Sequence, residues 1–191
     1  DDKEVKGVLE YVQTVAEHPF IYPMFVFAAH TGARRSEICR SLIDDFDFDA
    51  GVVTIRERKR RKDLAATTRQ VPLNDKLREV MNEWFAVHPG GQYTITLPLL
   101  MPMRRTARKE SGQMSRYEAS HHFKQTLVDS KWDKVRGFHV LRHSFGAICT
   151  RAQIPMNVIA AWMGHSTEEM KEHYQHILPQ DQQDWMKKLP L

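Results

Sequence analysis

Two arginines, two histidines and a tyrosine in this chain are the side-chain types needed to cleave a phosphodiester without a metal ion. They are Arg34, His139, Arg142, His165 and Tyr174. An arginine guanidinium group matches two phosphate oxygens and stays charged at any relevant pH. A tyrosine, whose unperturbed pKa is about 10, must lose its proton as it attacks, and a nearby histidine can take or relay that proton. The set therefore predicts nucleophilic attack on a phosphodiester.

The arginines and the first histidine lie in two short motifs. In the segment HVLRHSFG, His139 and Arg142 lie one helical turn apart and share a helix face. In the segment TGARRSE, Gly32 is expected to end one helix, and Arg34 then stands near the start of the next. Arg34 is therefore expected near a helix start, and Arg142 on the same helix face as His139.

The candidate nucleophile lies in a third segment, GHSTEEMKEHY. Tyr174 comes nine positions after His165. Ser166 followed by Glu169 is typical of a capping box that opens a helix, with Tyr174 further along that helix.

The order and separation of these motifs resemble the catalytic domain of tyrosine recombinases, the phage-integrase family, from about residue 5 to residue 178. The positions that match the family's catalytic side chains are Arg34, Lys59, His139, Arg142, His165 and Tyr174. The resemblance implies that Tyr174 forms a 3′-phosphotyrosyl link, while His139 and His165 share proton handling and phosphate hydrogen bonding. Glu37 matches an acid that accompanies the first arginine; it either orients a catalytic group or pairs with a neighbouring arginine.

The family's lysine, which protonates the departing 5′-hydroxyl, lies in the turn of a β-hairpin. Residues 52–73 have the pattern of such a hairpin, with strand-like VVTIRERK and TTRQVPL around a basic, polar turn. Lys59 closes the first strand and is our choice, with Lys62 as the alternative. Basic stretches beside a phosphate site position the duplex, so we expect DNA contacts from this hairpin at Arg56, Arg58, Arg60, Arg61, Lys62 and Arg69.

Composition agrees with a nucleic-acid partner. The chain has 191 residues, a net charge of +4 and a pI near 9.1, which suits one domain with an acidic partner. Cys39 and Cys149 are the only cysteines, and each lies in an apolar helical pattern typical of a reduced, buried thiol. No apolar run approaches membrane-spanning length, and the first residues do not form a signal peptide. We therefore expect a cytoplasmic protein, and the family resemblance implies that it is nucleoid-associated and of prokaryotic or phage origin.

Periodicity predicts an α+β fold, mainly α-helical, with a small antiparallel sheet near residues 43–73. Asn74 is a predicted N-cap, and Ser115 with Glu118 forms a second predicted capping box. The expected helices span residues 5–18, 20–30, a short stretch through Ile38 and Leu42, 75–88, 116–130, 139–152, 155–163, 167–177 and 180–188. Most of residues 91–114 is expected to be loop.

The resemblance also implies partners. These are double-stranded DNA and further copies of this chain, assembled as a tetramer on DNA, without a membrane. We expect no cofactor: no carboxylate cluster suits a two-metal nuclease, and His139 with His143 lacks the glutamate of a zinc H-E-x-x-H motif. We expect residues 1–191 to form a single catalytic domain without the family's N-terminal core-binding domain. An excised catalytic domain is our choice, with a natural minimal form as the alternative. The alternatives are relaxation of DNA in the manner of a type IB topoisomerase, and a non-catalytic DNA-binding protein of the same fold.

Overall fold

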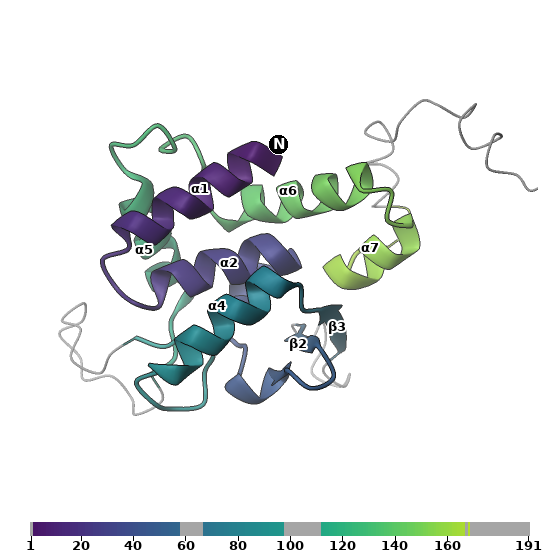
Figure 1. Ribbon diagram of the computed structural model, residues 1–191, viewed down its shortest axis with the longest axis horizontal. Coiled ribbons are helices and arrows are strands. Elements are labelled where there is room, and N and C mark those ends of the chain that lie inside the picture. The colour runs from purple at the N-terminus through teal and green to yellow at the C-terminus, as the bar shows by residue number, and fades with distance from the viewer. Residues whose placement is uncertain (1, 58–66, 98–111, 167, 169–191) are drawn as a thin grey trace, which may run out of the picture.

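The computed structural model describes residues 2–57, 67–97, 112–166 and 168, drawn in colour in Figure 1. The helices are α1 (Asp2–Val15), α2 (Ile21–Thr31), α3 (Arg35–Ile38), α4 (Asp75–Ala86), α5 (Arg116–Leu127), α6 (Phe138–Arg151) and α7 (Met156–Met163), with a 3₁₀ turn at Ile43–Asp45. The strands are β1 (Phe46–Asp47), β2 (Val52–Arg56) and β3 (Thr68–Pro72). Among the helices described, none combines the length and apolar character that crossing a bilayer requires.

Helix α2 is the centre of the helical part. Its sequence, IYPMFVFAAHT, is apolar on nearly all sides, as expected of a fully surrounded helix. It packs against α1, α3, α4, α5 and α6 (Figure 1). An aromatic series continues from it, because Phe25 stacks on Phe123 of α5 and Phe123 packs on Phe138 of α6. This series fixes the first turn of α6 relative to the middle of α2.

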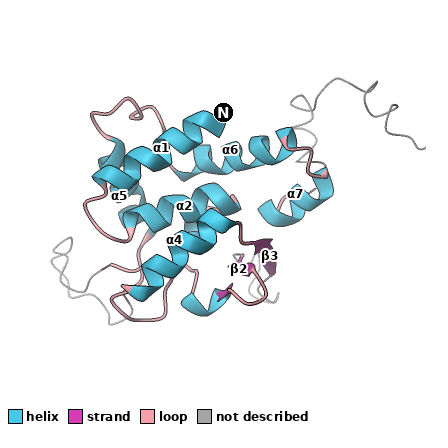
Figure 2. Ribbon diagram, viewed as in Figure 1, coloured by secondary structure: helices cyan, strands magenta, loops and turns pink. Residues whose placement is uncertain are grey.

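The three strands form one antiparallel sheet in the order β1-β2-β3, beside α7 (Figures 1 and 2), and Phe46 of β1 packs against Phe27 of α2 and Phe85 of α4. Val53 pairs with Val71, and Ile55 pairs with Arg69. Directly paired residues lie on the same face of an antiparallel sheet. Because Val53, Ile55 and Val71 are buried, Arg69 lies on the inward face with them.

Several local predictions are confirmed. Gly32 ends α2 in the left-handed conformation, with φ 62°. The Asn74 side chain accepts the Leu77 N–H at 2.9 Å. Ser115 and Glu118 form the reciprocal capping box of α5. The mainly helical fold with its small antiparallel sheet agrees with the prediction from sequence.

The short helix predicted through Leu42 is wrong at its C-terminal end, since α3 ends at Ile38. The residues that follow pair with a distant segment instead of continuing the helix. The Thr94 N–H donates to the Ser41 carbonyl at 2.9 Å, and Leu42 forms a bridge with Tyr93. Tertiary pairing thus overrides the local helical pattern. The helices predicted at 180–188 and over most of 167–177 lie outside the described residues, as does most of the predicted loop.

Candidate active site

One pocket of about 560 Å³ brings Arg34 together with His139 and Arg142, both of α6. The other charged side chains that line it are all basic: Arg35, Arg116, Lys124 and Arg136. Gly137 and Phe138 complete part of the wall, so the N-terminal end of α6, which carries the positive end of the helix dipole, faces the pocket. A pocket with this lining has the electrostatic character of an anion site.

Arg34 is the N-cap residue of α3, in an extended conformation. Its backbone N–H donates to Glu37 Oε2 at 2.7 Å, and its Nη1 donates to Glu37 Oε1 at 2.9 Å. Its Nη2 donates to the Gly164 carbonyl at 3.1 Å. The side chain is still 41% exposed. Arg34 is therefore anchored along one edge and open to the pocket along the other.

Arg142 is buried, with 2% of its surface exposed. Its two Nη atoms donate to the carbonyls of Gly32 and Met163, each at 2.5 Å. These carbonyls lie at the C-terminal ends of α2 and α7, where the helix dipole is negative. A buried guanidinium ion needs such partners to offset its desolvation. The two helix ends therefore hold a charged arginine at the pocket wall.

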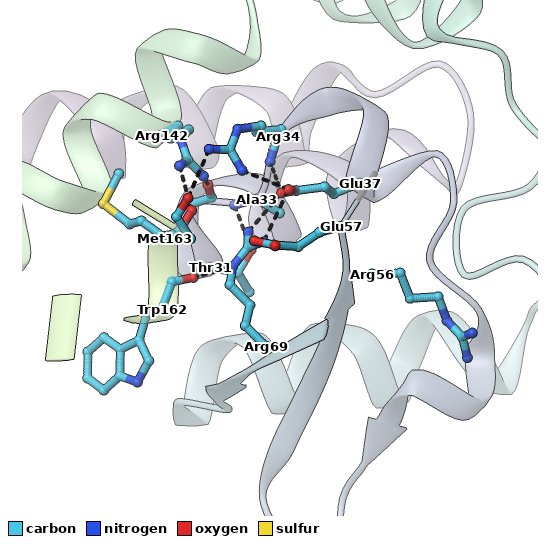
Figure 3. Close-up of polar contacts among 12 residues, drawn as sticks. Thr31, Ala33, Arg34, Glu37, Arg56, Glu57, Arg69, Arg142, Trp162 and Met163 are labelled. Atoms are coloured by element: carbon cyan, nitrogen blue, oxygen red, sulfur yellow. Dashed lines mark hydrogen bonds and ion pairs between the residues drawn. The ribbon is translucent and has the colours of Figure 1, made fainter. Parts of the chain in front are cut away.

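Figure 3 shows that three arginines contact the C-terminal end of α7. The last carbonyls of a helix have no partner within that helix. Three successive carbonyls here each accept from a different guanidinium group: Trp162 from Arg69 at 2.7 Å, Met163 from Arg142 at 2.5 Å and Gly164 from Arg34 at 3.1 Å. The end of α7 is thereby fixed to both pocket arginines.

Gly164 ends α7 in the left-handed conformation, with φ 64°. A Cβ atom here would collide with the Glu57 carboxylate and come within 3.1 Å of Arg69 Nη1. Glycine is therefore required by both conformation and space. His165 follows directly, and its N–H donates to the Ala160 carbonyl at 3.0 Å. This cap holds the His165 backbone next to the carbonyl that Arg34 contacts.

Glu37 is buried at 3% exposure and lies between two arginines. It pairs with Arg34 at 2.9 Å and with Arg69 at 2.8 Å. Burial alone raises the pKa of Glu37, but the hydrogen bonds and charge of Arg69, together with the hydrogen bonds from Arg34, outweigh burial and leave the pKa below its usual value. Glu37 is therefore ionised at neutral pH and pairs with both neighbouring arginines.

His139 has a partner one turn along α6. Its Nε2 lies 2.8 Å from Nε2 of His143, and the rings meet edge to face at 4.2 Å between centroids. A hydrogen bond between two imidazole nitrogens requires that one carries a proton and the other accepts it. His143 thus provides His139 with a proton donor or acceptor. The i, i+4 spacing of the two histidines is visible in the sequence, where it was weighed only as a zinc pair and rejected.

Arg69, which was predicted to contact DNA, makes its hydrogen bonds within the protein. The Arg69 side chain is 7% exposed, and its guanidinium group donates hydrogen bonds to the Trp162 carbonyl and to the carboxylates of Glu37 and Glu57. The Arg56 side chain, by contrast, is 45% exposed and pairs with the buried carboxylate of Asp45. The alternation of Arg69 with buried Val71 was the signal that places Arg69 on the inward face.

Other predicted site residues lie outside the described part of the chain: Arg58, Lys59, Arg60, Arg61, Lys62 and Tyr174. Sequence reasoning also missed the remaining basic side chains of the pocket wall, which come from three segments: Arg35, Arg116, Lys124 and Arg136. No local motif links these segments. Their common position depends on how α3, α5 and the start of α6 pack together.

Comparison with known proteins identifies the family. The model of the phage integrase family matches residues 1–181, and the chain belongs to this family, the tyrosine recombinases, whose enzymes cleave and rejoin DNA. Transposase B from transposon Tn554 of Staphylococcus aureus is 24% identical over 165 residues, which cover 83% of this chain and 25% of the transposase. Tyrosine recombinase XerC of Xylella fastidiosa is 24% identical over 147 residues, covering 77% of this chain and 45% of XerC. The chain thus spans a quarter to about half of these relatives.

Solved structures share the fold. The XerA recombinase crystal structure aligns with a TM-score of 0.71 at 16% identity, over 100% of this chain and 65% of XerA. The catalytic domain of bacteriophage HP1 integrase aligns with a TM-score of 0.63 at 18% identity, over 100% of this chain and 94% of that domain. The described elements therefore form the fold of a tyrosine recombinase catalytic domain.

Proposed function

We propose that this chain is the catalytic domain of a site-specific DNA recombinase of the integration or excision type. It cleaves and rejoins DNA through a 3′-phosphotyrosyl intermediate, with Tyr174 as the nucleophile. The observation that supports this most directly is that Arg34 and Arg142 line one basic pocket. Their position matches what the chemistry needs, namely two guanidinium groups on one phosphate.

In this proposal the scissile phosphate occupies the pocket. Negative charge grows on its non-bridging oxygens as the nucleophile attacks, and Arg34 and Arg142 neutralise it from different sides. Both guanidinium groups are already held by backbone carbonyls, so little reorganisation is needed during the reaction. Removal of one preorganised donor of this kind typically costs about 3–4 kcal/mol of activation energy.

The proton transfers are assigned to the histidines and the lysine. The Tyr174 oxygen loses its proton and forms a bond to phosphorus, and the bond from phosphorus to the 5′-oxygen breaks. Lys59, with Lys62 as the alternative, protonates that leaving oxygen. His139 and His165 hydrogen-bond the phosphate and handle the tyrosine proton, and His143 supports His139. A 5′-hydroxyl from another duplex then reverses the attack, so the bond energy is kept without ATP or a metal.

The proposed partner is double-stranded DNA, whose flanking phosphates fit the rest of the basic wall. Solved relatives include XerH recombinase bound to its difH substrate and Tn1549 integrase in complex with DNA. Exchange between two duplexes requires four strand cleavages, so we propose a tetramer of this chain on DNA. In this assembly each protomer supplies one pocket.

The test is covalent trapping on nicked suicide duplexes that carry candidate sites. The intact chain should form a protein–DNA adduct, and Tyr174→Phe should form none. An adduct that persists in Tyr174→Phe would remove Tyr174 as the nucleophile. Joining of two duplexes would support recombination, whereas loss of supercoils from a single plasmid without joining would support a topoisomerase instead.

A further inference from the structure

We infer that Arg69 is a positioning residue for the proposed reaction, which fixes the end of α7, with Gly164 and His165, against Arg34. The inference rests on the proposed function. It assigns Arg69 a task within the protein in place of the DNA contact expected from its sequence context.

The first argument is the direction of the Arg69 hydrogen bonds. Nε donates to the Trp162 carbonyl at 2.7 Å, while Nη2 donates to Glu37 Oε2 at 2.8 Å. Nη1 donates to carboxylate oxygens of Glu37 and Glu57, each at 3.1 Å. One planar group thus joins α7, α3 and the end of β2 (Figure 3). A flexible ammonium group lacks the planar fork that holds such partners at once.

The second argument is that the two other arginines at the same helix end belong to the pocket. Arg34 contacts the carbonyl of Gly164 and also Glu37, the acid that Arg69 holds. A shift of Glu37 or of the α7 end therefore moves a pocket arginine. Arg69 does not line the pocket itself, so it acts on the phosphate only through these contacts.

The third argument is charge balance in a buried site. The Glu37 side chain is 2% exposed, and that of Arg69 is 7% exposed. In a variant without Arg69, Glu37 loses one of its two arginine partners and keeps only its ion pair with Arg34. Glu57 also loses its ion pair with Arg69. The Glu37 carboxylate then competes more strongly for Arg34, which draws that guanidinium group away from a phosphate.

The first measurement needs no DNA. In the folded intact chain, the Gly164 and His165 amides both donate to the Ala160 carbonyl, so their hydrogen exchange reports on the α7 cap. We expect Arg69→Gln and Arg69→Lys to increase exchange at these amides by at least about tenfold, while the amides of α4 stay protected. Unchanged exchange at both amides in a folded variant would overturn the inference, whatever the chain does to DNA.

The second measurement separates positioning from binding. On suicide duplexes that trap the wild-type chain, both Arg69 variants should form the adduct about 100-fold more slowly, as expected for a displaced catalytic group. Their Kd for the same duplex should stay within about twofold, since Arg69 gives no phosphate contact of the kind that sets affinity. A weakened Kd with a normal rate of adduct formation would instead show that Arg69 binds DNA directly.

The control is Arg78→Gln. Arg78 donates to the Phe48 carbonyl at 2.5 Å, which is the same kind of bond placed away from the pocket. We expect normal exchange at Gly164 and His165 and a normal rate of adduct formation.

The Arg69→Lys variant keeps the positive charge. If it shows the same amide protection and the same rate of adduct formation as the wild-type chain, Arg69 acts only through its charge and the inference is overturned. Absence of an adduct with the wild-type chain would contradict the proposed function, while the exchange result would still test the α7 cap.

Discussion

Replacement of Gly164 by alanine should destabilise the fold at the point where α7 meets the arginines. Gly164 has φ 64°, and a left-handed conformation costs a non-glycine residue about 1–2 kcal/mol. The added Cβ would also overlap Oε1 of Glu57, the end of a flexible side chain, so Glu57 must move away and give up its ion pair with Arg69, at a cost of about 0–1 kcal/mol. We therefore expect Gly164→Ala to lower the free energy of unfolding by about 1–3 kcal/mol in total.

Urea unfolding at neutral pH, followed by circular dichroism, measures this change. Gly90→Ala is the matched control, because Gly90 also has positive φ, at 98°, but nothing lies within 4 Å of its Cβ position. The control should show the conformational cost alone. A further change of Glu57 to alanine should recover part of the Gly164→Ala loss by removing the collision. If Gly164→Ala is equally destabilising in the wild-type and Glu57→Ala backgrounds, the close approach of Glu57 to this glycine is refuted.

Two further predictions concern charge. The pKa of Glu37 is lower in the folded than in the unfolded chain, so its ionisation stabilises the fold above the unfolded pKa of about 4.3, and this stability is lost as pH falls through the folded pKa. The difference in free energy of unfolding between wild type and Glu37→Gln, measured by urea unfolding, should therefore become smaller below about pH 4. A difference that does not depend on pH would contradict this. The pocket-wall residues Arg116 and Lys124 are predicted to bind phosphates, so their joint change to glutamine should reduce the slope of log K for duplex binding against log salt by about 0.9 for each phosphate that is no longer neutralised. An unchanged slope in fluorescence-anisotropy titrations would place the duplex elsewhere.

The parts of the fold that could be predicted from the sequence depend on local signals. Gly32 and Asn74 mark helix ends through backbone conformation and capping, and these effects act within a few residues. His139 and Arg142 share a helix face because of helical periodicity alone. Family resemblance added the expectation that Arg34 joins them, and the structure places all three at one pocket.

Contacts between distant segments could not be predicted in this way. The sequence predicted that Arg69 contacts DNA with the other basic residues of the hairpin. The only signal that it lies on the inward face of the sheet was its alternation with Val71. The Thr94 N–H determines where α3 ends through its bond to the Ser41 carbonyl, and no local pattern indicates such pairing. The basic wall from α5 likewise depends on how helices pack.

The most direct test of the central claim is a crystal structure of the intact Tyr174→Phe variant on the duplex that traps the wild-type chain. Arg34 and Arg142 should both donate to non-bridging oxygens of one phosphodiester group at the cleavage site, at about 2.7–2.9 Å. His139 should lie at the same phosphate. A complex in which the two arginines contact different phosphates, or in which the cleavage-site phosphate lies outside the basic pocket, would contradict the account.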